Sequence, residues 1–280
     1  MAGAAPPRTA PRSTSFASLA LALALAACGG PPKRQTAAEW VSENTTILSQ
    51  LQSWNPDELH QGIARFLKLG RDRGTEVVNY LLEDSGMQNV YNYERIELVL
   101  ARILAEWKDS RAIRRLLPYM RGRDSGSLSI AKEGLIAFGD DARILEAVKE
   151  LLDDSDVEVR RNAAEVVSEM KGQEAVDILG EHYRVEENLE VRGACVMGLL
   201  NPRSKGERKM EFILDALEDK DLGIRQLAWD AVALKEPPVP FDPAGEPAVR
   251  KRAVQELRKW AHVKPAGRAP LKVAGEDRSS

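Results

Sequence analysis

A twelve-residue pattern that recurs four times in the carboxy-terminal half constrains the fold of this chain more than any other feature. Internal repeats with a period of about 20–50 residues are typical of architectures in which each unit packs only on its neighbours. The four copies, aligned on one arginine, are DVEVRRNAAEVV (156–167), NLEVRGACVMGL (188–199), DLGIRQLAWDAV (221–232) and EPAVRKRAVQEL (246–257). The aligned arginines are Arg160, Arg192, Arg225 and Arg250.

Each column of this alignment has a physical reason. In three copies an Asp or Asn stands four residues before the arginine, where its side chain can accept a hydrogen bond from the free N–H groups that begin a helix. Apolar or small residues one before, three after and seven after the arginine fall on a single helical stripe. Amphipathic segments at 142–152 and 208–217 precede two of the copies. The pattern therefore predicts an all-α fold, an α-solenoid of stacked helix–turn–helix repeats.

The segment LLDDSDVEVRRNAAEVV (151–167) and its two downstream copies resemble the HEAT repeats, including the subgroup named after phycobilisome lyases. In that family an acid in the turn and an arginine in the second helix form a ladder between adjacent repeats. The resemblance implies that Asp154 pairs with Arg160 and that Asp219 pairs with Arg225. The intervening turn carries Glu186, which leaves the partner of its own arginine open. The residues assigned to this ladder are Asp154, Arg160, Arg192, Asp219, Arg225 and Arg250.

The amino terminus predicts export. Residues 1–15 contain two arginines and no acid, and the apolar run FASLALALALAA (16–27) follows. This run is too short to span a bilayer core of about 30 Å, so it indicates a secretory signal. It closes on LAAC (25–28), which resembles the lipobox of bacterial lipoproteins and implies that Cys28 carries fatty acyl groups such as palmitate. The alternative is a plain signal peptide with an incidental cysteine.

The lipobox implies a protein anchored in the bacterial cell envelope. Two or more acyl chains hold a protein stably on a membrane. Because Gly29 and not an aspartate follows the cysteine, resemblance to the enterobacterial sorting rule favours the outer membrane. The predicted organisation is a signal peptide (1–27), a flexible tether (28–35), an amino-terminal helix (36–52), about six repeats (53–262, best defined over 142–260) and a disordered tail (263–280).

Composition and chemistry argue against several other functions. The net charge of −3 does not suit a nucleic-acid partner, which calls for a basic face. There are three histidines, and His182 has Glu186 at i+4, but no second histidine joins them, whereas zinc commonly takes four ligands. Cys195 falls on the buried stripe and is expected to be a packed thiol. We therefore expect no catalytic residues, no metal, no cofactor and no small-molecule substrate.

The remaining expectation is an interaction module. Solenoids present a long concave face made by successive second helices. This pattern, with the lipobox, predicts a membrane-anchored, extracytoplasmic and non-catalytic scaffold for an unidentified protein or peptide. Two alternatives stay open, namely a lyase-like or other enzyme sharing these repeats and a purely structural envelope protein. The residues expected to face the partner lie just off the buried stripe and are Arg161, Glu165, Gln226 and Asp230.

Overall fold

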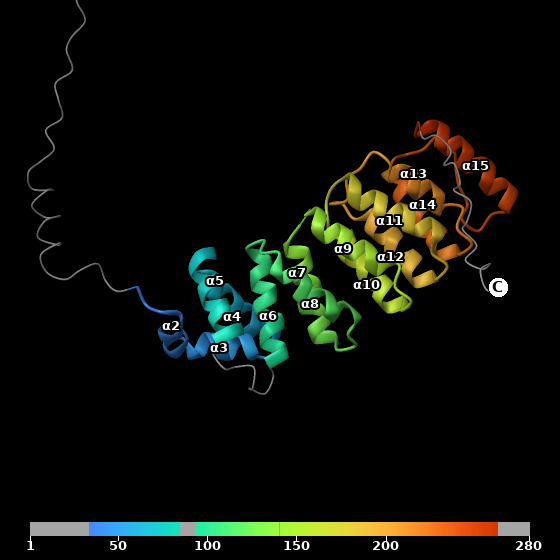
Figure 1. The fold of residues 1–280 in the computed structure, drawn as a ribbon. Helices are drawn as coiled ribbons and strands as arrows, with labels where there is room; N and C mark the ends of the chain where they lie inside the picture. The colour runs from blue at the N-terminus through green and yellow to red at the C-terminus, as the bar shows by residue number, and fades with distance from the viewer. Residues whose placement is uncertain (1–33, 85–92, 140, 263–280) are drawn as a thin grey trace, which may run out of the picture.

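The computed structural model describes residues 34–84, 93–139 and 141–262, and every regular element within them is helical (Figure 1). This confirms the all-α prediction. The predicted signal peptide with Cys28 and the predicted tail at 263–280 lie outside the described residues. The α-helices are α2 (Ala37–Glu43), α3 (Thr45–Gln52), α4 (Pro56–Leu67), α5 (Arg71–Asn79), α6 (Tyr93–Glu106), α7 (Arg111–Leu116), α8 (Ser125–Ala137), α9 (Ala142–Leu152), α10 (Val157–Ser168), α11 (Gln173–Val185), α12 (Leu189–Leu200), α13 (Lys209–Ala216), α14 (Leu222–Ala233) and α15 (Pro247–Trp260).

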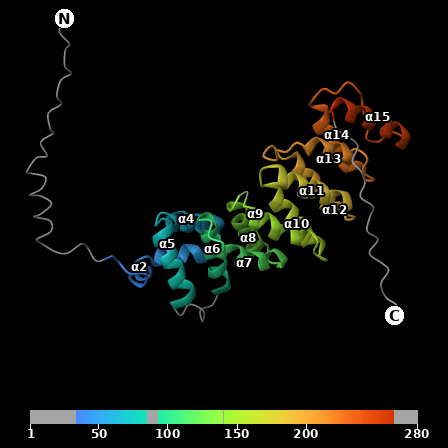
Figure 2. The same cartoon turned by 45° about the horizontal axis from the view of Figure 1, so that its top comes forward.

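The helices form the two layers of an α-solenoid. Helices α6, α8, α10, α12 and α14 pack on one another in that order and make the second-helix layer. The first-helix layer consists, in chain order, of α7 with its 3-10 extension η3 (Leu117–Arg121), then α9, α11 and α13. In both views the array is elongated, with α2 at one end and α15 at the other (Figures 1 and 2).

Side-chain caps begin the second helices where the alignment predicts them. The carboxylates or amide oxygens of Asp156, Asn188 and Asp221 each accept a backbone N–H of the first turn, at 2.9–3.0 Å. The predicted stripe is buried in the first three copies, since Val159, Ala163 and their equivalents there pack in one continuous apolar core, whereas Val249 of the fourth copy is exposed. Each unit thus buries its apolar surface by packing against its neighbours. This burial stabilises the fold by about 25 cal/mol per Å² of apolar surface removed from water.

The amino-terminal prediction of one helix over 36–52 is wrong, because Asn44 divides it. Asn44 ends α2 and begins α3 with a non-helical backbone (φ −112°, ψ 36°), and its side-chain Nδ2 donates to the carbonyl of Trp40 at 2.8 Å. The chain therefore turns after one short helix. Farther on, a π-helical turn η1 (Tyr80–Asp84) extends α5.

The last aligned copy also departs from the pattern. Helix α15 packs against α13, in the first-helix layer, and does not continue the second helices. The proline-rich loop at 235–246 lies between α14 and α15, and its Phe241 is buried against Trp229, with ring centroids 5.5 Å apart. Proline disrupts a helix interior, so this stretch is a loop, and α15 begins only after it.

Candidate functional site

The outer surface of α10, α12 and α14 is the candidate functional site, and we call it the second-helix face. In each of these helices, it comprises the residue three positions before the aligned arginine, the residue one position after it and the residue five positions after it. These three residues are spaced four apart and therefore lie along one side of the helix. The face consists of Val157, Arg161 and Glu165 on α10, Leu189, Gly193 and Met197 on α12, and Leu222, Gln226 and Asp230 on α14.

The four residues expected to face a partner lie in two pairs at the borders of this face. On α10, Arg161 donates to Glu165 at 3.0 Å and to Glu158 at 2.5 Å. On α14, the Gln226 amide donates to Asp230 at 2.8 Å. Lys132 of α8 also forms an ion pair with Glu165, which links the border to the preceding repeat. The polar borders are thus held in place by hydrogen bonds within the chain.

The centre of the second-helix face is apolar, which the sequence interpretation missed. Leu189, Met197 and Leu222 keep 47%, 58% and 48% of their surfaces exposed. Between the first two, Gly193 leaves a depression, since a Cβ placed there meets no other atom within 4 Å. The signal was present in the alignment, because the positions one and five after Arg192 hold Gly193 and Met197 where the neighbouring copies hold polar residues.

The aligned arginines beneath this face connect consecutive repeats, but not through the predicted pairs. Arg160 donates through Nε and Nη2 to Glu186 of the following repeat, at 2.8 and 3.1 Å. It reaches Asp154 of its own repeat only at the backbone carbonyl, at 2.8 Å. The Asp154 carboxylate instead accepts from Arg121 of the preceding repeat, at 2.8 Å. The prediction of an Asp154–Arg160 side-chain pair is therefore wrong, because each arginine pairs with the acid of the repeat after its own.

Arg192 repeats this arrangement in a buried setting. Its Nε and Nη2 donate to the Asp219 carboxylate at 3.0 and 3.3 Å, and its Nη1 donates to the Glu187 carbonyl at 2.5 Å. The hydroxyl of Tyr183 donates to the same carboxylate at 2.8 Å. Asp219 is therefore satisfied by the arginine before it, and the predicted Asp219–Arg225 side-chain pair is not formed.

The ladder changes its chemistry at its carboxy-terminal end. Arg225 donates through Nη1 to the carbonyl of Asp219 and through Nε to the carbonyl of Pro243, at 2.8 and 2.7 Å. The carbonyl of Pro243 in this loop thus takes the position that the acid of a following repeat has in the other two rungs. Arg250 donates to the Gly245 carbonyl, and its buried Nε has no partner in the described part of the chain. Within the described residues, Arg250 therefore does not form the predicted fourth rung to an acid.

The acids of the ladder also shape the turns. Asp154, Glu186 and Asp219 each accept the backbone N–H of the residue two positions on, at 2.8–3.0 Å. For Glu186, burial favours the neutral form, but the hydrogen bonds from Arg160 and from the Asn188 N–H outweigh it, so its pKa is lowered. One carboxylate therefore fixes a turn and joins two repeats.

His182 and Cys195 lie close to the Glu186 rung. His182 Nε2 is 3.1 Å from a Glu186 carboxylate oxygen, and burial lowers the pKa of His182 more than this acid raises it. Burial raises the pKa of the Cys195 thiol to about 12. The thiol is fully buried, as a packed side chain is, and thiolate chemistry at neutral pH is disfavoured there.

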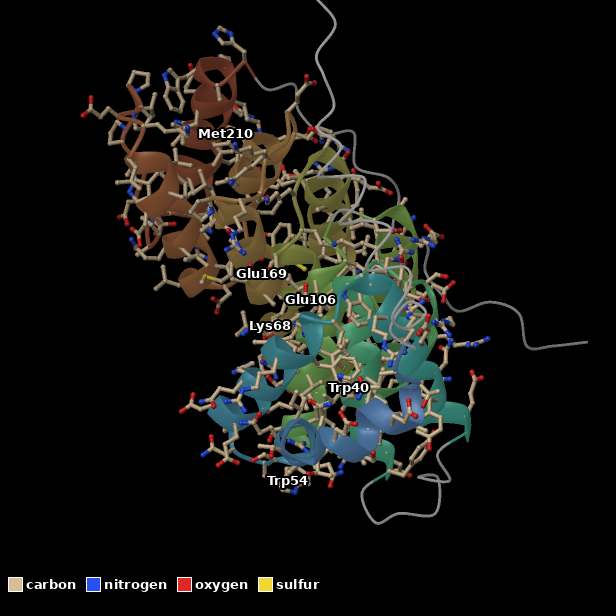
Figure 3. All side chains as sticks on the ribbon, turned by 90° about the vertical axis from the view of Figure 1, so that its left-hand side faces the viewer. Trp40, Trp54, Lys68, Glu106, Glu169 and Met210 are labelled. Atoms are coloured by element: carbon tan, nitrogen blue, oxygen red, sulfur yellow. The ribbon has the colours of Figure 1, made fainter. Side chains whose placement is uncertain are left out.

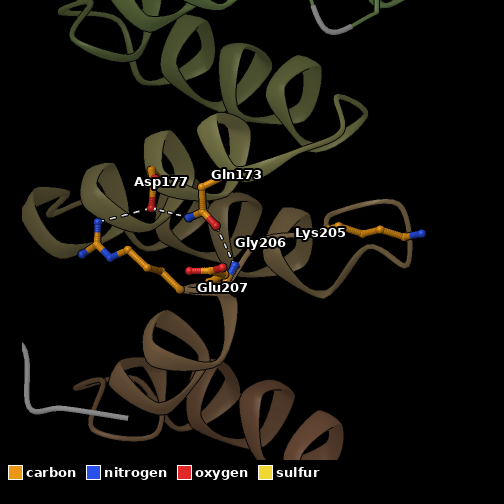
Figure 4. Close-up of a pocket in the computed structure, with 6 residues that line it drawn as sticks. Gln173, Asp177, Lys205, Gly206 and Glu207 are labelled. Atoms are coloured by element: carbon orange, nitrogen blue, oxygen red, sulfur yellow. Dashed lines mark hydrogen bonds and ion pairs between the residues drawn. The ribbon is translucent and has the colours of Figure 1, made fainter.

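A groove between α11 and the loop before α13 has a volume of about 820 Å³ (Figure 4). Its polar side chains already bond to one another, since Gln173 accepts the N–H of Glu207 and donates to Asp177, while Arg208 also donates to Asp177. In the described ranges, no three His, Cys, Asp or Glu side chains are grouped so as to hold a metal ion. No described helix is both long and apolar enough to cross a bilayer.

A smaller feature lies at the amino-terminal end. Trp54 is 62% exposed and lies at the outer edge of this end, whereas Trp40 lies among the helices (Figure 3). The Arg95 guanidinium stacks over the Trp54 ring at 3.9 Å and donates to the Ser53 carbonyl at 2.6 Å. This cation–π contact ties the turn before α4 to α6 and makes a structural connection.

Comparison with known families matches residues 129–200 to HEAT repeats. The matched stretch begins within α8 and ends with α12, so it includes the Arg160–Glu186 rung and Arg192, but not Asp219, the partner of Arg192. The class of the protein is thus an α-solenoid, and its residues 129–200 match HEAT repeats. No curated protein matches the chain.

Proposed function

We propose that this protein is a lipid-anchored scaffold of the bacterial cell envelope that binds a partner protein on its second-helix face and catalyses no reaction. The observation that carries the proposal is the composition of that face. Three apolar side chains, Leu189, Met197 and Leu222, are exposed on it, and Gly193 leaves the space between the first two open. Exposed apolar patches with polar borders are typical of protein interaction sites.

The ladder supports this function through rigidity. Each rung fixes the position of one second helix relative to the next, so the exposed side chains of α10, α12 and α14 keep a defined spacing. A surface that is ordered before binding loses less conformational entropy when a partner docks. The lipobox supplies the second half of the proposal, because an acylated Cys28 and the segment after it place this surface near a membrane.

Site-specific photo-crosslinking in intact cells tests the binding half. A photoreactive amino acid at position 193, where the depression has room for it, is expected to crosslink one defined partner. The matched control places the same group at Glu174, an exposed position on α11 in the other layer. Equal crosslinking from both positions, or none from either, contradicts a partner site on the second-helix face.

Labelling with a fatty-acid analogue tests the anchoring half. The full chain is expected to incorporate the label and to fractionate with membranes, and the Cys28→Ala variant is expected to lose both properties. A label that persists in Cys28→Ala contradicts acylation at this cysteine.

A further inference from the structure

We infer that the partner segment is a basic amphipathic helix that lies along α12 on the second-helix face. The inference rests on the proposed function and adds the chemistry of the partner to it. Its observations are the spacing of the exposed apolar residues and the excess of carboxylates around them.

The apolar stripe has the dimensions of a helix-binding site. Leu189, Gly193 and Met197 are spaced by four residues, so they run along α12 for two turns, about 12 Å at 1.5 Å per residue. Leu222 adds apolar surface from the start of α14. A partner helix with apolar residues at i, i+4 and i+7 matches such a stripe. Gly193 permits close approach, and the unbranched Met197 side chain can adapt to the partner.

The border of the stripe is predominantly acidic. Its two cations, Lys132 and Arg161, are already engaged by Glu165 and Glu158. Glu190 follows Leu189 on α12 and lies close enough to Arg161 to favour its charged form, and Asp230 on α14 accepts the Gln226 amide at 2.8 Å. Neither carboxylate forms an ion pair in the described part of the chain. The acids at this border are Glu158, Glu165, Glu190 and Asp230.

With four acids against two cations, the border carries an excess of negative charge beside an apolar stripe, which favours a partner that brings Lys or Arg to its flanks. Complementary charge of this kind steers association and selects the orientation, while like charge on a competing partner is repelled. An acidic or uncharged amphipathic helix matches the stripe but not its border.

Fluorescence anisotropy with three labelled synthetic peptides of eighteen residues tests the inference on the purified full chain bearing Cys28→Ala. The first peptide is an amphipathic helix with Leu on one face and Lys on both flanks. The second has Glu in place of every Lys, and the third has the first composition in scrambled order. The Lys-flanked helix is expected to bind at least tenfold more tightly than either of the others, with an affinity that falls as salt is added.

Variants locate the site. Met197→Glu and the double variant Glu190→Lys/Asp230→Lys are each expected to weaken binding of the Lys-flanked helix at least tenfold. The matched controls are Val249→Glu on α15 and Glu174→Lys on α11, both at exposed positions, and they are expected to stay within twofold of the parent chain. Because all of these side chains are exposed, the variants are expected to fold, which circular dichroism checks.

Several results overturn the inference. They are equal or tighter binding of the Glu-flanked helix, equal binding of the scrambled peptide, no binding of any peptide, and equal effects of the site variants and their controls. A self-associated chain that Met197→Glu dissociates in analytical ultracentrifugation also overturns it, in favour of a second copy as occupant. If the basic helix fails while crosslinking from position 193 captures a defined partner, only the inference falls and the proposed function stands.

Discussion

The two halves of the solenoid hold their helices in register by different means. From α9 to α14, Arg160 and Arg192 each donate hydrogen bonds to an acid of the following repeat and to a backbone carbonyl of their own turn. From α2 to α6, an aromatic cluster takes this role, with Trp40 edge-on to Phe66 at 5.3 Å and Phe66 beside Trp107 at 6.3 Å. The carboxy-terminal half therefore repeats one arginine–acid contact between neighbouring repeats. The amino-terminal half has charged hydrogen bonds too, such as Arg73 Nη2 to the Thr36 carbonyl at 2.9 Å and Arg111 Nη1 to Asn79 at 2.7 Å, but they join unrelated positions.

The two rungs also satisfy their arginines fully. All three side-chain nitrogens of Arg160 and of Arg192 have partners, whereas Arg95 of α6 leaves Nε and Nη1 without any in the described residues. Arg250, which forms no such rung, also leaves its buried Nε without a described partner. A repeated contact of this kind suits a surface built from three second helices.

The largest effect expected from this contrast follows removal of a buried rung. Arg192→Ala leaves the buried Asp219 carboxylate without its cation, so we expect a loss of about 3–5 kcal/mol in the free energy of unfolding. Arg95→Ala removes one hydrogen bond and a ring contact, and we expect about 1–2 kcal/mol. Urea denaturation measures both, and equal losses contradict the contrast between the halves.

Glycines at helix contacts provide a second comparison, in which the two halves are expected to agree. An added Cβ lies 2.0 Å from the Trp107 ring at Gly74 and 2.2 Å from the Phe212 ring at Gly180. Gly74→Ala and Gly180→Ala are each expected to destabilise the chain by about 1–3 kcal/mol through overpacking. The control Gly193→Ala meets no atom and is expected to stabilise α12 by about 0.5–1 kcal/mol. Thermal unfolding separates the three, and a destabilised Gly193→Ala contradicts the open depression.

Acidification is expected to weaken the ladder half selectively. The folded pKa of His182 lies below its ordinary value of 6.5, so the unfolded chain binds more protons and stability falls as the pH drops below 6.5. The folded pKa of Glu186 is also lowered, from 4.5, so its contribution is lost at still lower pH. Hydrogen exchange between pH 7 and 5 is expected to show α10–α12 losing protection before α4–α6. The variant His182→Gln is expected to reduce this loss, and an unchanged profile argues against a role for His182.

The smallest effect is expected at the junction of the halves. Arg121 joins η3 to Asp154 at 2.8 Å, but its side chain is 54% exposed. Exposed ion pairs contribute little, so Arg121→Ala is expected to change the free energy of unfolding by less than about 1 kcal/mol. A loss comparable to that of Arg192→Ala contradicts the distinction between buried and exposed rungs.

Periodicity predicted the fold class because the apolar stripe and the Asp and Asn caps act within single helices. Val159, Ala163, Asp156 and Asn188 lie where the alignment places them. Local patterns of this kind are set by helix geometry and need no tertiary information. They sufficed to place the second helices and the four polar residues at the borders of the face.

Long-range contacts were not predictable in the same way. Asp154 lies near Arg160 along the chain, and Glu186 lies near it in space. The stacking of the repeats determines which of the two carboxylates accepts the hydrogen bond from Arg160 Nε. The break at Asn44 and the shift of α15 onto α13 depend on tertiary packing. The apolar centre at Gly193 and Met197 was readable from the alignment, but its exposure depended on how α10 and α14 flank α12.

The central claim is that each arginine couples its repeat to the next one, and a double-mutant cycle measures that coupling most directly. We predict a coupling energy of about 0.5–3 kcal/mol between Arg160→Ala and Glu186→Ala. For Arg160→Ala with Asp154→Ala, whose side chains are not hydrogen-bonded to each other, we predict a smaller coupling energy. A coupling energy that is larger for the Asp154 pair than for the Glu186 pair contradicts the ladder as described.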